Sequence, residues 1–127
     1  MSNEVIKVLL ADDEEEYVSA LAERLTLRGL EVRTALRGED AISFLTEEEF
    51  QVAVIDYMMP DLSGLEILKK AKEKNPCLQV IILTGRGSTR EGIEGMQLGA
   101  FDYLMKPVDI ETLIGRIRSA SAKSNET

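Results

Sequence analysis

The 127-residue sequence predicts a single α/β domain in which helices cover both faces of a doubly wound, five-stranded parallel sheet. Two observations predict this fold class. Short apolar segments alternate five times with segments of helical periodicity, as in chains built from strand–helix–strand units. Three apolar segments are almost continuous, which is typical of parallel strands buried on both faces. Small sheets of this kind most often have the strand order 2-1-3-4-5, as in flavodoxin-like folds.

The strands and helices can be placed in order along the chain. Strands are expected at residues 5–10, 31–35, 52–55, 80–83 and 101–105. Between them, apolar residues recur three and four positions apart, as on the buried face of a helix. These residues are Val18, Leu21, Ala22 and Leu25, then Ala41, Ile42, Phe44 and Leu45, then Leu65, Leu68 and Ala71, and finally Ile110, Leu113, Ile114 and Ile117. Gly29 is expected to end the first helix, Asn75–Pro76 the third, and Asp109 to cap the last.

Two segments depart from this regular pattern. The helix expected from Ser88 to Leu98 is weak, because Gly92 and Gly95 would each cost about 1 kcal/mol relative to alanine. Such an element can supply a moving part, although a poorly packed surface helix is the alternative. The final residues, SASAKSNET, are polar and are expected to be frayed or to begin a linker. The domain is therefore expected at residues 1–120, with a tail at 121–127.

The composition argues against several classes of function. The net charge of −8 disfavours direct binding to nucleic acid or to an anionic membrane surface. We expect a cytoplasmic protein, since no segment reads as a signal peptide or membrane span and the one cysteine, Cys77, cannot form an internal disulfide. The sequence contains no histidine. A metal ion would therefore have to bind to oxygen ligands, which favours Mg²⁺ or Mn²⁺.

Polar residues follow the predicted strands at the edge where the strands' carboxyl ends meet. Asp12 and Asp13 follow the first strand and Asp56 follows the third. Thr84 follows the fourth strand and Lys106 the fifth. In the expected strand order the first and third strands are neighbours, and ligands bind where the chain reverses direction between them. We therefore expect these five side chains to converge.

Three ionised carboxylates in one place would destabilise the fold. At about 5 Å separation and an effective dielectric constant of about 20, each pair repels by roughly 3 kcal/mol, so three pairs cost on the order of 10 kcal/mol. The net stability of such a domain is only about 5–15 kcal/mol. The cluster must therefore shift its pKa values or bind a cation such as Mg²⁺. With Lys106 and Thr84 as donors, the set suits a phosphoryl group carried on a carboxylate.

Four motifs in order resemble a response-regulator receiver domain of the chemotaxis type. They are LLADDEEE, VAVIDYMMPDLSGLEIL, VIILTG and GAFDYLMKPVD, and the resemblance covers about residues 4 to 120. Each motif alone is weak, whereas the four together are specific. Met58 and Arg86 depart from the chemotaxis regulator beside the path of the hydrolytic water, which leaves the lifetime of a phosphoryl group open.

The resemblance implies a phosphorylation site with a metal ion. Asp56 would accept a phosphoryl group from a histidine kinase or a phosphotransfer protein. Asp12 and Asp13 would hold Mg²⁺ together with Asp56 and the backbone carbonyl of Met58.

The resemblance also implies a switch. Lys106 and Thr84 would contact the phosphoryl group, and Tyr103 would be an aromatic switch that follows Thr84. The bond between Lys106 and Pro107 would be cis. The change would reach the face of the fourth helix, fifth strand and fifth helix, where an effector protein or output domain would dock.

Plainer interpretations exist for single residues. Asp12 and Asp13 could cap the first helix, and Glu14 to Glu16 are interpreted as first-turn acids that complement the helix dipole. Tyr103 could be a core aromatic residue.

Two other classes of function make different demands on the sequence. A phosphatase of the haloacid dehalogenase type would require Asp-x-Asp, whereas Tyr57 and Met58 follow Asp56. A pseudo-receiver would bind a partner without phosphorylation, against which the intact Asp56, Thr84 and Lys106 count. We therefore expect a signalling domain rather than an enzyme.

Overall fold

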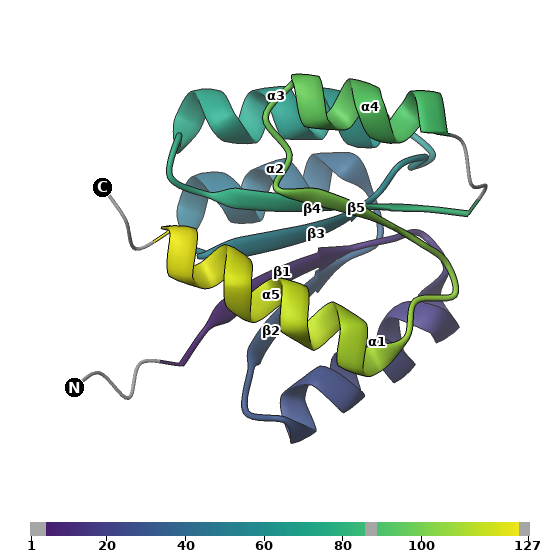
Figure 1. Ribbon diagram of the computed structural model, residues 1–127, viewed down its shortest axis with the longest axis vertical. Coiled ribbons are helices and arrows are strands. Elements are labelled where there is room, and N and C mark those ends of the chain that lie inside the picture. The colour runs from purple at the N-terminus through teal and green to yellow at the C-terminus, as the bar shows by residue number, and fades with distance from the viewer. Residues whose placement is uncertain (1–4, 86–88, 125–127) are drawn as a thin grey trace.

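The computed structural model describes residues 5–85 and 89–124, in which five strands alternate with five helices (Figure 1). The strands are β1 (Lys7–Ala11), β2 (Glu31–Ala35), β3 (Val52–Asp56), β4 (Gln79–Thr84) and β5 (Asp102–Met105). The helices are α1 (Glu15–Leu27), α2 (Gly38–Glu47), α3 (Gly64–Lys74), α4 (Thr89–Gln97) and α5 (Ile110–Ser124). All paired strands are parallel and their order is β2-β1-β3-β4-β5, which confirms the predicted fold class and topology.

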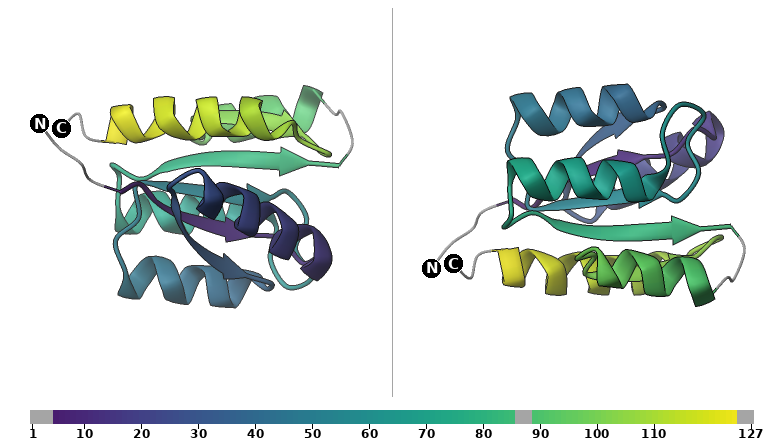
Figure 2. Two further views of the ribbon diagram at one scale, coloured as in Figure 1. Left: turned by 90° about the horizontal axis from the view of Figure 1, so that it is seen from below. Right: turned by 90° about the horizontal axis from the view of Figure 1, so that it is seen from above.

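The sheet separates two hydrophobic cores, which explains the continuous apolar strands. Along β1, Leu9 faces the core beneath α2 and α3, whereas Val8 and Leu10 face the core beneath α1 and α5. Strands β3 and β4 alternate in the same way, so that successive side chains are buried on opposite faces. Figure 2 shows the resulting layers, with every strand pointing the same way.

The helix boundaries follow the predicted signals. After α1, Gly29 has a φ of +90°, and the Leu30 N–H donates to the Leu25 carbonyl at 3.2 Å. At the start of α5, Asp109 Oδ2 accepts a hydrogen bond from the Thr112 N–H at 3.0 Å, as expected for an N-cap. Helix α3 ends at Lys74, directly before the expected Asn75–Pro76 boundary.

The expectation of a frayed tail was wrong as far as Ser124. Helix α5 continues to that residue, past the expected boundary at residue 120. Ala120 and Ser121 are buried because they continue the inner face of the helix three and four positions after Ile117. Their small or polar side chains hid this periodicity in the sequence.

The segment with two internal glycines does form a helix, although part of the expectation lies outside the described residues. Helix α4 runs from Thr89 to Gln97 and includes both Gly92 and Gly95, whereas Ser88 is not described. Ile93 and Met96 on this helix are about half exposed, at 49% and 44%. Helix α4 therefore presents apolar side chains to solvent beside β5.

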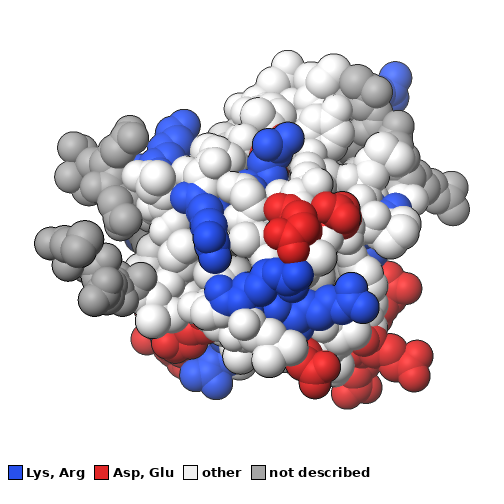
Figure 3. Space-filling model, turned by 60° about the horizontal axis from the view of Figure 1, so that its bottom comes forward, with Lys and Arg blue, Asp and Glu red and all other residues white. Residues whose placement is uncertain are grey.

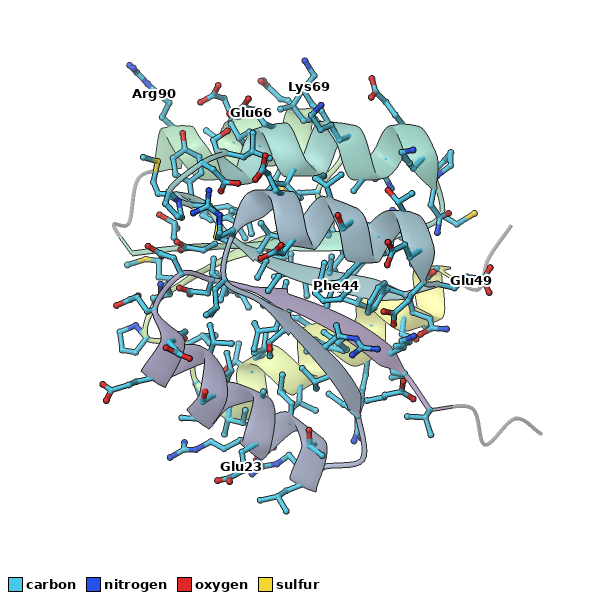
Figure 4. All side chains as sticks on the ribbon, turned by 180° about the vertical axis from the view of Figure 1, so that it is seen from behind. Glu23, Phe44, Glu49, Glu66, Lys69 and Arg90 are labelled. Carbon is cyan, nitrogen blue, oxygen red and sulfur yellow. The ribbon has the colours of Figure 1, made fainter. Side chains whose placement is uncertain are left out.

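Charge is distributed unevenly over the surface. On the face of α1 and α5, Lys and Arg side chains gather in a band despite the net charge of −8 (Figure 3). The exposed basic residues of this face are Arg24, Arg28, Arg116, Arg118 and Lys123. On the opposite side, the charged side chains of Glu66, Lys69 and Arg90 point away from α3 and α4 into solvent (Figure 4). No described helix is both long enough and apolar enough to cross a membrane.

Candidate functional site

The three predicted aspartates converge at the carboxyl ends of the strands. One carboxylate oxygen from each of Asp12, Asp13 and Asp56 lies within 4.8 Å of the others. The register places the ends of β1 and β3 side by side, with Ala11 opposite Ile55. Asp12 is fully buried, Asp56 is 7% exposed and Asp13 is exposed, so the cluster is open to solvent on one side.

Backbone contacts fix Asp12 at the end of β1. Its N–H donates to the Ala35 carbonyl at 3.0 Å, and its Oδ1 accepts from the Glu14 N–H at 3.0 Å. This contact with the N-cap residue Glu14 forms a turn before α1 and does not satisfy an N–H of the first helical turn, so the plainer interpretation of Asp12 as a helix cap was wrong. Its second oxygen, Oδ2, is buried and close to Lys106 but lacks a hydrogen bond of good geometry.

The loop after β3 holds Asp56 in place. A β-carbon at Gly64 would lie 2.6 Å from the backbone oxygen of Asp56, so only glycine lets α3 begin this close to the strand. Both carboxylate oxygens of Asp61 accept the first two N–H groups of α2, at 2.7 and 2.9 Å. Ser63 forms a capping box with Glu66 at the start of α3. The segment between Asp56 and α3 is therefore anchored at several points.

The environment of Asp56 disfavours its ionised form. Burial raises the pKa of Asp56 to about 6, and the neighbouring Asp12 charge adds to this, while Lys106 opposes both effects. A carboxyl group at this pKa is still mostly ionised near neutral pH. Burial is therefore the main cause of the raised pKa, and the predicted repulsion between the carboxylates adds to it.

Lys106 lies at the centre of the acidic cluster. Its Nζ is 2.8 Å from Asp12 Oδ2, 2.6 Å from Glu14 Oε1 and 3.3 Å from Asp56 Oδ1. Burial alone lowers the pKa of Lys106, but the contacts with Asp12 and Glu14 outweigh it and raise the pKa above its usual range. The ammonium is therefore charged and lies within 3.3 Å of Asp56 Oδ1. Its bond to Pro107 is cis, as the resemblance implied.

Two residues at this site were missed in the sequence. Glu14 was interpreted only as a first-turn acid, and this was wrong, because it precedes α1 and pairs with Lys106. The ring of Tyr17 lies 5.0 Å from Lys106 Nζ, a distance typical of a cation–π contact. Their spacing of three residues, which places both at the same side of the helix start, was the only signal.

The two predicted switch residues lie on neighbouring strands. Thr84 ends β4 and is buried, and its carbonyl accepts from the Lys106 N–H at 2.8 Å. Tyr103 on β5 is half-buried and packs on the core beneath α2 and α3. Its ring also lies against Gly92 of α4, so Tyr103 is both a partial core residue and a neighbour of the weak helix.

The chain matches the family described as response regulator receiver domain over residues 8–118, which is most of its length. It belongs to this family. Receiver domains are the phosphorylated signalling domains of two-component response regulators, and phosphorylation on aspartate is their general mechanism. The family thus implies a kinase partner.

Curated relatives of this receiver domain are transcriptional regulatory proteins. CpxR of Escherichia coli (strain K12) is 38% identical over 119 residues, covering 94% of this chain and 50% of CpxR. The probable regulator TcrX of Mycobacterium tuberculosis is 34% identical over 122 residues, covering 96% of this chain and 52% of TcrX. The chain therefore spans about half the length of these relatives.

Solved structures show the same fold. The receiver domain of the Francisella response regulator 1452 superimposes with a TM-score of 0.88 at 34% identity, covering 94% of this chain and 99% of that one. A CheY-like receiver domain protein from Methanospirillum hungatei gives a TM-score of 0.91 at 27% identity, covering 97% and 98%.

The metal-binding prediction can be compared with the donors present in this receiver domain. Asp12, Asp13 and Asp56 supply carboxylate oxygens, the ligand type that Mg²⁺ prefers, and Asp12 Oδ2 is a buried oxygen with capacity for a further contact. The donor set therefore fits a hard divalent cation. Met58, in the loop after β3, is 65% exposed, whereas the adjacent Met59 is buried. Arg86 lies outside the described residues.

Proposed function

We propose that Asp56 accepts a phosphoryl group from a histidine kinase or phosphotransfer protein in a Mg²⁺-dependent reaction. The observation that carries the proposal is the convergence of Asp12, Asp13 and Asp56 within 4.8 Å, with the Lys106 ammonium in contact with Asp12 and Asp56. A carboxylate next to two others and a cation, in a cluster open to solvent on one side, has the composition of a phosphoryl-transfer site.

The residues that would hold Mg²⁺, or Mn²⁺ in its place, are Asp12, Asp13, Asp56 and the backbone carbonyl of Met58. When bound, the cation supplies positive charge that neutralises the oxygens of the transferred group. The anchored loop between Asp56 and α3 would keep the Met58 carbonyl at the edge of the cluster.

In the proposed transfer, a carboxylate oxygen of Asp56 forms a bond to phosphorus as the bond to the donor's histidine nitrogen breaks. Lys106 donates a hydrogen bond to a phosphoryl oxygen and contributes a charge that its raised pKa makes permanent. Thr84, at the end of the adjacent strand, donates its hydroxyl to another oxygen. We propose that the group is later lost by intrinsic hydrolysis, so the domain acts as a signalling element and not as an enzyme with turnover.

The proposed output is a change at the face of α4, β5 and α5. Movement of Thr84 toward the phosphoryl group would let Tyr103 follow. The exposed side chains of Ile93, Met96 and Met105 give this face an apolar character suited to a protein partner. We propose an effector protein or an output domain as that partner, in keeping with relatives named as transcriptional regulators.

A cytoplasmic setting is part of the proposal, and the exposed Cys77 fits a reducing compartment.

Mass spectrometry after incubation with Mg²⁺ and a small acyl phosphate tests this function. The wild-type protein is expected to gain the mass of one phosphoryl group, and Asp56→Asn is expected to gain none. Asp40→Asn, which changes an exposed aspartate at the start of α2, is the matched control and should behave as wild type. Absence of the mass shift in wild type, or its survival in Asp56→Asn, would refute the assignment.

A further inference from the structure

Glu14 makes the shortest contact of the Lys106 ammonium. The distance between Glu14 Oε1 and Lys106 Nζ is 2.6 Å, compared with 2.8 Å to Asp12 and 3.3 Å to Asp56. The Glu14 side chain is 63% exposed, whereas that of Lys106 is 12% exposed. The lysine is thus held in the site from the solvent side by a residue outside the cluster of three aspartates.

The contact with Glu14 occupies an N–H donor of Lys106, and a phosphoryl group on Asp56 also needs an N–H donor from this lysine. A lysine ammonium has three N–H donors, and three carboxylates surround Nζ in this structure. A phosphoryl group on Asp56 would need at least one of these donors for its own oxygens. Lys106 already donates to Asp56 Oδ1, but at 3.3 Å this is the longest of the three contacts. A closer contact with a phosphoryl oxygen would move the ammonium towards Asp56 and lengthen at least one of the two shorter contacts, of which the one to Glu14 is on the exposed side.

We propose that Glu14 is a positioning residue that holds Lys106 in the unphosphorylated arrangement and so slows transfer of the phosphoryl group to Asp56. The inference rests on the proposed function of Asp56. Glu14 precedes the first residue of α1, where its own N–H is held by Asp12, so its backbone is fixed relative to the site. The negative charge of Glu14 also repels an anionic donor, but this general effect is shared with its neighbours.

The chain offers a matched control for that general charge effect. Glu15 is an exposed acid of the first turn of α1, and within the described chain it forms no ion pair. Glu14→Gln and Glu15→Gln remove the same charge one residue apart. A difference between them therefore reports the contact with Lys106.

Initial phosphorylation rates with acetyl phosphate and excess Mg²⁺ test the kinetic part of the proposal. Glu14→Gln is expected to react about two- to fivefold faster than Glu15→Gln, a range that matches the loss of one exposed ion pair. In a Lys106→Met background the two substitutions are expected to change the rate equally. Equal rates in the wild-type background, or a slower Glu14→Gln, would overturn the proposal.

Thermal unfolding without Mg²⁺ tests the contact independently of phosphorylation. Glu14→Gln shifts the melting temperature by some amount in each background. This shift is expected to be more negative by about 1–4 °C when Lys106 is present than in the Lys106→Met background. The same change in both backgrounds would show that Glu14 does not hold Lys106. A wild-type protein that takes up no phosphoryl group would instead refute the proposed function, while this thermal comparison would still decide the contact.

Discussion

The ring of Tyr103 lies so close to Gly92 that a β-carbon at Gly92 would fall 2.4 Å from two atoms of the ring. No side chain other than hydrogen fits between α4 and the ring in this arrangement. The glycine that weakens α4 as a helix is thus the residue that lets the aromatic side chain pack beneath it.

Gly92→Ala is expected to displace the Tyr103 ring. The new methyl group must push the ring outward, because the ring atoms are the movable end of the contact. NMR contacts between the Tyr103 ring and α4 are expected to disappear. The gain in helix propensity of up to about 1 kcal/mol would be offset by the lost packing.

Gly95→Ala is the matched control for this substitution. A β-carbon at Gly95 meets its neighbours at 3.6–3.8 Å, which is ordinary contact. Gly95→Ala should therefore stabilise the protein by up to about 1 kcal/mol and leave the Tyr103 ring in place. Unchanged Tyr103 contacts in Gly92→Ala would contradict the steric argument.

Helix α4 is expected to open more readily than the other helices. Gly92 and Gly95 lower its helix propensity, and it exposes Ile93 and Met96 rather than burying them fully. In hydrogen–deuterium exchange followed by mass spectrometry, amides of Thr89–Gln97 should exchange faster than those of α3. Equal protection of the two helices would refute this prediction.

Asp56 is expected to destabilise the metal-free protein at neutral pH. Its raised pKa of about 6, compared with 3.8, means that the folded protein binds this proton more tightly than the unfolded chain. The contribution of Asp56 to the free energy of unfolding therefore falls as pH rises from about 4 to about 6, and it stays low at higher pH. Relative to wild type, Asp56→Asn should be more stable by about 2–3 kcal/mol near pH 7.5 and by little near pH 4.

Thermal unfolding of wild type and Asp56→Asn at both pH values, in the presence of a chelator, measures this difference. The comparison between the two proteins cancels the effects of carboxylates outside the cluster, and the measured difference reports Asp56 together with its coupling to Asp12, Asp13 and Lys106. A stability gain of the same size at both pH values would show that the ionisation of Asp56 is not its cause.

Mg²⁺ is expected to stabilise the fold through the acidic cluster. At a concentration about 100 times its dissociation constant, a bound cation adds about 2.7 kcal/mol to the free energy of unfolding. Asp13→Asn should lose most of this stabilisation, because it removes one of the three converging carboxylates. Melting temperatures with and without Mg²⁺ measure the effect, and Asp40→Asn should retain it. If Mg²⁺ stabilised Asp13→Asn as much as wild type, Asp13 would not be a ligand of the cation.

The sequence predicted the sheet and the aspartate cluster because both depend on strand order. Once buried strands such as Val52–Asp56 are recognised as parallel, their carboxyl ends must share one edge of the sheet. Asp12, Asp56 and Lys106 lie at the carboxyl ends of their strands and must therefore lie at that edge. This inference needs no side-chain geometry. It therefore placed each aspartate correctly without any knowledge of distances.

What could not be predicted depends on contacts between elements. In a run of five acids, nothing local distinguishes Glu14, which reaches Lys106 across the sheet edge, from Glu15, which does not. The close approach of Tyr103 to Gly92 depends on where α4 lies over β5. The extension of α5 to Ser124 was hidden because small side chains carry a weak apolar signal.

Because the sheet separates two hydrophobic cores, substitutions in this domain can be grouped by the core in which they lie. Glu14 and Tyr17 belong to the layer of α1 and α5, whereas Gly92 and Tyr103 belong to the layer with α4. Under the proposed function, substitutions around Glu14 would change the rate at which the signal is received. Substitutions around Gly92 and Tyr103 would change only the α4 side of the proposed output face, because its α5 side lies in the layer of Tyr17.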